Sequence, residues 1–169
     1  MKGVLTLAAL IAGMVGCGTK EQATSEFTGN QTTYALQQSS QYEVSGTVTF
    51  KEKKDGSTLV EVELKGTSGN AKYPVHLHLG DLSVQGASIA AQLNPVLGST
   101  GKSQTSLTQL ADETKISYQA ITKLDASIKI HLSDSGPEKD IILSAGNIGI
   151  AAANGLSSGR LGVGVCESK

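Results

Sequence analysis

The sequence predicts an all-β fold, either a β-sandwich or a flattened barrel, on three observations. From Tyr42 onward, apolar and polar residues alternate along short stretches, which is the period of a half-buried strand. No stretch keeps a helical period beyond about two turns, and 20 glycines punctuate the chain. Short strands at this spacing are typical of a sandwich or barrel, and a length of 169 residues suits one domain.

The composition excludes two other classes of protein. Hydrophobic residues make up 38% of the chain and charged residues 17%, which is too apolar for a disordered, charged tail. The 14 basic and 15 acidic side chains give a formal net charge of −1. Because nucleic-acid binders normally carry a basic excess, we expect no nucleic-acid partner.

The first two predicted strands form a hairpin. Residues 44–50 and 58–65 both alternate between apolar and polar side chains. Asp55-Gly56, which lies between them, is a dipeptide typical of a tight hairpin turn.

The second half of the chain begins with a long connection. It is rich in Gly and Ser and runs from Gly80 to about Thr114, and residues 87–93 within it are the best candidate for a short helical turn. Further strands are expected at residues 115–120, 126–132 and 140–150.

A predicted strand over residues 73–79 carries two of the three histidines of the chain. The residues expected to face the core are Val75, Leu77 and Leu79. Because successive side chains of a strand point to opposite faces, His76 and His78 share the outer, polar face. Their Cβ atoms are then roughly 7 Å apart, a spacing at which two imidazoles can chelate one ion.

The third histidine lies on another predicted strand, over residues 126–132. Ile128 and Ile130 alternate toward the core there, so His131 also points outward. Together with the pair on the neighbouring strand it would complete a three-nitrogen set, which suits copper or zinc rather than calcium or magnesium. The alternative is that all three are surface histidines that bind nothing.

The first 16 residues predict a bacterial lipoprotein signal peptide. Met1-Lys2 is followed by an apolar run shorter than the ~20 residues of a spanning helix, and small residues precede Cys17 as in a lipobox. We expect cleavage before Cys17, acylation of its thiol and anchoring to the cell envelope, with an ordinary secretory signal as the alternative. Residues 17–41 would then form a tether and a first edge segment, and residues 42–169 the domain.

Only Cys166 would remain as a free thiol after acylation of Cys17. A single remaining thiol leaves no internal disulfide, so the hydrophobic core alone must hold the fold together.

Several short motifs resemble, in order, the copper/zinc superoxide dismutase family. They are Gly46-Thr-Val-Thr-Phe-Lys-Glu-Lys-Lys-Asp-Gly56, His76-Leu-His78 followed by Gly80-Asp81, Asn94-Pro95, Ile128-Lys-Ile-His131 and Ala145-Gly-Asn-Ile-Gly149. Chordin-type (CHRD) domains of bacterial surface proteins are similar at the flanks, in Gly29-Asn-Gln-Thr-Thr-Tyr34 and Gly146-Asn-Ile-Gly149. Both resemblances imply a Greek-key β-sandwich over about residues 44–150.

The dismutase resemblance implies a copper site of four histidines, three of which fall on His76, His78 and His131. The fourth, which bridges copper and zinc in the family, falls on Gln92 in this chain. Because no His lies between His78 and His131, we expect one copper ion and no zinc. The stretch from Gly98 to Asp112 supplies no histidine for a zinc site, and the family's disulfide has no counterpart.

The family also has an active-site Arg, and the residue that corresponds to it in this chain depends on which segment forms the last strand. If Ala145-Gly-Asn-Ile148 belongs to it, the Arg position is Ile142. If residues 158–165 form it instead, Arg160 takes that position. Both registers stay open.

Three functions follow from these patterns. The chain is a module that stores, delivers or buffers copper at the envelope, a copper-only dismutase, or a structural or adhesive CHRD-type module with incidental histidines. In the dismutase, Gln92 or water would be the fourth ligand and Arg160 would steer superoxide. We expect the first: a metal ion and a lipid membrane as partners, with little or no catalysis.

Overall fold

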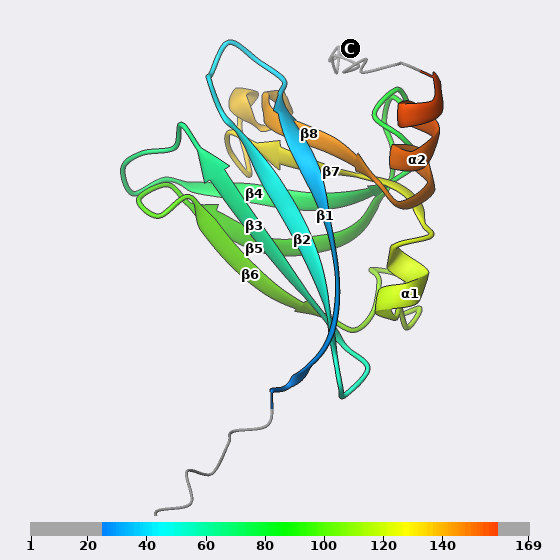
Figure 1. Cartoon of the computed structure of the whole chain (residues 1–169). Coiled ribbons are helices and arrows are strands. Elements are labelled where there is room, and N and C mark those ends of the chain that lie inside the picture. Colours follow the sequence, from blue (N-terminus) through cyan, green and yellow to red (C-terminus); the bar gives the residue numbers. More distant parts are fainter. Residues whose placement is uncertain (1–24, 159–169) are drawn as a thin grey trace, which may run out of the picture.

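The computed structural model describes residues 25–158 and confirms the all-β prediction. Within this part of the chain, eight antiparallel strands close into a barrel, with short helices outside it (Figure 1). The strands are β1 (Phe27–Gln38), β2 (Ser45–Lys53), β3 (Thr58–Lys65), β4 (Lys72–Leu79), β5 (Ile89–Leu97), β6 (Lys102–Leu107), β7 (Asp125–His131) and β8 (Ile142–Ile148). The helices are α1 (Tyr118–Ile121), the 3-10 helix η1 (Pro137–Asp140) and α2 (Gly149–Ser158).

The strands follow one another around the barrel in the order β1-β2-β3-β6-β5-β4-β7-β8, and β8 pairs back onto β1. Strands β4, β5 and β6 form a meander, and β7 returns to lie beside β4, which is a Greek key. Closure pairs β1 on both sides, with β2 and with β8. The segment expected as a first edge is therefore an internal strand, and the barrel begins before residue 42.

The predicted hairpin is confirmed. β3 has the predicted bounds, and its alternate side chains Val60 and Val62 are buried against Val48 and Phe50 of β2. In the turn, Gly56 has a φ of +86°, a left-handed conformation that suits glycine.

The long connection after β4 was predicted incorrectly, because it contains β5 and β6. In β5, two adjacent alanines are buried and the register against β4 shifts twice, so the alternation is broken. Alanine also has a low strand propensity, which explains why residues 87–93 resembled a helical turn. β6 contributes one buried residue, Leu107, and its six-residue pairing with β3 makes it a strand.

The prediction of a strand at residues 115–120 is also wrong. α1 begins at Tyr118, and the side chain of Ser117 caps it by accepting a hydrogen bond from the Ala120 N–H at 3.3 Å. Ile116 and Tyr118 are two residues apart and both buried, so the sequence shows here the alternating pattern of a strand.

The last strand within residues 25–158 agrees with one of the two registers considered for the active-site Arg, and the alternative segment, residues 158–165, lies almost entirely outside the described residues. β8 includes Ala145 and ends at Ile148, and it closes the barrel against β1. The sequence predicted a strand up to residue 150, whereas the chain turns at Gly149, with a φ of +58°, and enters α2. Arg160 lies outside the described residues, so its role stays a prediction.

Candidate metal centre

The three histidines lie on two neighbouring strands of the barrel, β4 and β7. The antiparallel register of these strands places Val75 opposite Ile130 and Leu77 opposite Ile128, and all four side chains are fully buried in the core. Because neighbouring residues on a strand point to opposite faces, the histidines lie together on the outer face. The shared outer face predicted from the alternation is therefore confirmed.

Leu79 differs from the prediction. It was expected in the core with Val75 and Leu77, but it is 43% exposed. Leu79 is the last residue of β4, and the pairing with β5 shifts register between Leu77 and His78. The barrel interior thus ends before this residue.

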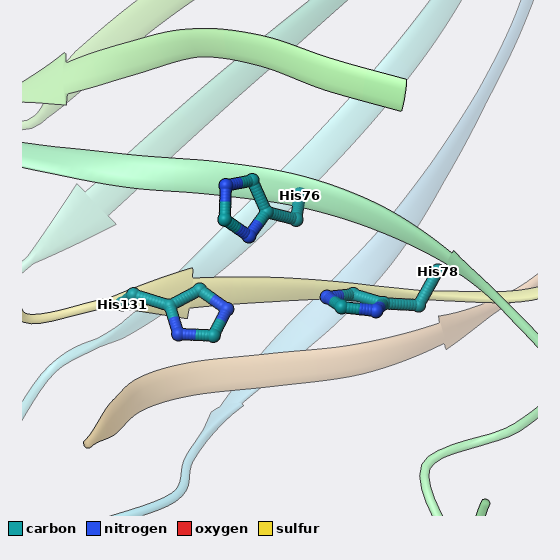
Figure 2. A group of neighbouring side chains, drawn as sticks. All are labelled: His76, His78 and His131. Carbon is teal, nitrogen blue, oxygen red and sulfur yellow. The ribbon is translucent and has the colours of Figure 1, made fainter. Parts of the chain in front are cut away.

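The imidazole rings face a common centre (Figure 2). The ring centroids are 4.8 Å apart for His76 and His131, 5.8 Å for His76 and His78, and 6.2 Å for His78 and His131. Each residue offers one ligand atom, and these atoms lie within 4.8 Å of one another. Within residues 25–158, these three histidines are the one group of His, Cys, Asp or Glu side chains placed so that they could hold a metal ion.

The outer face is covered at this point, which the sequence analysis did not predict. Residues between β4 and β5 fold over it, and Leu82 packs with Ile142 and Ala145 in a small apolar cluster outside the main core. As a result His78 is only 7% exposed, and His76 and His131 are half-buried. The site is therefore partly buried and not an open polar surface.

Backbone hydrogen bonds orient two of the rings. The Nδ1 of His78 lies 2.9 Å from the carbonyl oxygen of Ala87, and the Nδ1 of His131 lies 2.8 Å from that of Lys139. A carbonyl oxygen can only accept, so both Nδ1 atoms carry the proton and leave a lone pair on Nε2. These two Nε2 atoms and the Nδ1 of His76 are buried without a hydrogen-bond partner. Two lone pairs are thus fixed on Nε2 atoms, and neutral His76 offers a third from Nδ1 when its proton is on Nε2.

The surroundings keep the imidazoles neutral. Burial lowers the pKa of His76 to about 4, helped by the charges of the other two histidines. Burial also lowers the pKa of His78 and of His131, and the positive charge of Lys129 adds to this. The backbone hydrogen bond of each ring and, for His131, the carboxylate of Asp140 act in the opposite direction. Neutral imidazole is the form that binds metal.

Gln92, which takes the place of the fourth histidine in the resemblance, lies beside the site. It is directly opposite His76 in the pairing of β5 with β4, so both side chains are on the outer face. Gln92 is exposed, whereas the nitrogens of the three histidines are buried. The side of the site next to β5 therefore has an exposed polar neighbour.

Lys129 is a residue of the site that the sequence analysis missed. It lies opposite His76 in the pairing of β7 with β4 and is only 4% exposed. The alternation that places His131 outward also places Lys129 outward, so the signal was present in the sequence. Its burial was not, because burial depends on the covering segment.

Of the remaining predicted residues, one borders the site and three are undescribed. Ile142, the position that the resemblance gives to an active-site Arg, lies opposite His131 in the pairing of β7 with β8. Cys17, Arg160 and Cys166 lie outside the described residues.

Comparisons with known proteins assign no family. No protein-family model matches the chain, and the search of curated proteins found no match. Among the described helices, none is both long and apolar enough to cross a membrane.

The lowered histidine pKa values make the stability of the metal-free chain depend on pH. Below the ordinary histidine pKa of about 6.5, the unfolded chain takes up protons that the folded site rejects. Stability is therefore complete above about pH 6.5 and falls as the pH drops toward about 4, the pKa of His76. Urea unfolding of the chelator-treated chain between about pH 7 and about pH 5 should show this fall.

A His76→Gln variant should lose less stability over the same range, because one buried titrating group is gone. Ser99→Ala, in an exposed turn, should keep the wild-type dependence. Equal pH dependence in the wild type and His76→Gln would contradict the assignment.

Proposed function

We propose that the protein binds one copper ion through His76, His78 and His131 and that it stores, delivers or buffers copper at the cell envelope. The observation that carries the proposal is the convergence of three buried nitrogens, all without hydrogen-bond partners, within 4.8 Å. A buried polar atom without a partner is costly, so three of them at one point favour a ligand there.

The chemistry of the site favours copper over other ions. Imidazole nitrogen is a ligand for copper and zinc, and calcium and magnesium prefer oxygen. A structural zinc ion normally takes four protein ligands, so three histidines do not suit structural zinc, although the same set can hold a catalytic zinc ion with an open fourth position. Three neutral nitrogens suit Cu(I), which accepts a low coordination number, better than Cu(II), which prefers a tetragonal set. Copper would supply one-electron exchange when bound.

The family resemblance is also part of the proposal. The superoxide dismutase family and the CHRD domains both imply a Greek-key fold, and the closed eight-stranded barrel with its Greek key agrees with that expectation. The motif histidines lie together in this barrel, which supports the reading of the motifs as one site.

A copper-only dismutase is the second candidate, and the exposed Gln92 beside His76 is the observation that favours it. A small anion could approach the ion from this side. Dismutation, however, requires a proton with each reduction of superoxide to peroxide, and the Gln92 amide does not titrate near neutral pH. The position expected for a guiding Arg holds the apolar Ile142 if the last strand is β8. We therefore expect copper binding with slow turnover.

Anchoring through an acylated Cys17 completes the proposal. β1 begins at Phe27 next to the end of β2, and it reaches β8 only at its other end, at Gln37 and Gln38. A tether before Phe27 would thus enter the barrel away from the β7–β8 pairing that borders the histidines.

The first test is copper binding. The chain should bind one Cu(I), and His131→Gln should weaken binding at least about tenfold, because two imidazoles chelate poorly. Thiolates also bind Cu(I), so competition with a chromophoric chelator is measured on chains that carry Cys17→Ser and Cys166→Ser.

Ser99→Ala is the control and should bind like the wild type. Unchanged affinity in His131→Gln would contradict the ligand set, and a wild type that binds no metal would favour the CHRD-type structural module.

The second test is superoxide turnover by the copper-loaded chain, measured by pulse radiolysis. The wild type should be inactive or slow, and Gln92→His should be faster, because imidazole titrates near neutral pH and binds copper better than an amide. A wild type near the diffusion limit would overturn the non-enzymatic proposal.

The third test addresses the anchor. Bacteria that express the chain are fed a fatty-acid analogue, and the label should appear on the wild type and not on Cys17→Ser, because the thiol carries the acyl chain. Cys166→Ser serves as the matched control and should be labelled normally. Equal labelling of Cys17→Ser would contradict lipidation.

A further inference from the structure

The side chain of Lys129 lies at the edge of the metal site. It is 4% exposed, lies opposite His76 on β4, and is two residues before His131 on the same face of β7. On its other side it lies opposite the fully buried Ala145 of β8. The residue is thus enclosed between the histidine cluster and the apolar cluster under Leu82.

Lys129 forms no salt bridge among the residues that the structure describes. The ion pairs between residues 25 and 158 join Lys51, Lys53 and Lys102 to acidic partners, and Lys129 takes part in none of them. Asp140, which acts on His131, is exposed, so water screens its charge. Burial is the main cause that lowers the pKa of His78 and of His131, and the positive charge of Lys129 acts in the same direction on both.

A fixed cation close to a metal site discriminates between ions by their charge. It repels a divalent ion twice as strongly as a monovalent one at the same position, and a partly buried site screens that repulsion less than bulk water does. Three neutral imidazoles do nothing to offset it. A lysine in this place therefore opposes Zn²⁺ and Cu(II) more than Cu(I).

We propose that Lys129 makes the three-histidine site selective for a monovalent ion, so that Cu(I) is favoured over Cu(II) and Zn²⁺. The proposal rests on the copper-binding function and adds the ion that the site prefers. Lys129 acts as a positioned charge and need not contact the ion.

The experiment compares dissociation constants for Cu(I) and Zn²⁺ on the full chain carrying Cys17→Ser and Cys166→Ser. Lys129→Met removes the charge and keeps an unbranched side chain, and Lys129→Arg keeps the charge. Lys65→Met, at an exposed position of β3, is the matched control. Thermal unfolding of each metal-free variant verifies that it is folded.

In Lys129→Met, the affinity for Zn²⁺ relative to that for Cu(I) should rise about tenfold or more. The Cu(II)/Cu(I) reduction potential should fall by about 59 mV for each tenfold rise in the affinity for Cu(II) relative to that for Cu(I). Lys129→Arg and Lys65→Met should keep the wild-type ratio. An unchanged ratio in folded Lys129→Met overturns the proposal, whereas a wild type that binds neither ion overturns the copper-binding function instead.

A measurement on the wild type alone serves if Lys129→Met does not fold. The ratio of the Cu(I) and Zn²⁺ dissociation constants should change less than about threefold between about 0.05 and about 0.5 M salt, since a charge beside a partly buried site is screened less than charges at the surface. A tenfold change would assign the selectivity to exposed charges and contradict the role of Lys129.

Discussion

The antiparallel pairing of β4 with β7 is the interaction on which the metal site depends. These two strands are distant in the sequence. If the register of either strand shifted by one residue, its histidine side chains would point into the core. Val75, Leu77, Ile128 and Ile130 prevent that shift, because all four are fully buried and a slipped strand would expose its apolar pair to solvent. The hydrophobic core therefore positions the ligands on the opposite face.

Burial of that opposite face turns three histidines into a set of ligands. The segment after β4 covers it through Leu82, and carbonyl groups of Ala87 and Lys139 accept hydrogen bonds from two of the rings. The same cover removes water, which lowers the histidine pKa values and leaves three nitrogens without partners. A fold that shields polar atoms in this way gains most from an ion that satisfies all of them together.

The charges around the site differ from those that the dismutase resemblance implies. The position expected for a guiding Arg holds the apolar Ile142 if β8 is the last strand, and the position of the bridging histidine holds Gln92. The positive charge of this site comes instead from Lys129, which is enclosed by the barrel wall and its cover. A cation beside a bound ion would affect which ion the site prefers, whereas a cation at the mouth of a site mainly attracts anions.

The sequence by itself determined the hairpin of β2 and β3, the strands β4 and β7, and the outward direction of His76, His78 and His131, because alternation is a local property of each strand. It did not determine β5 and β6, whose broken or polar patterns become strands through pairing with β4 and β3. Only the tertiary structure decided that the outer face is covered and that Lys129 is buried there. Burial depends on a segment that folds back from elsewhere in the chain, and no local pattern records that contact.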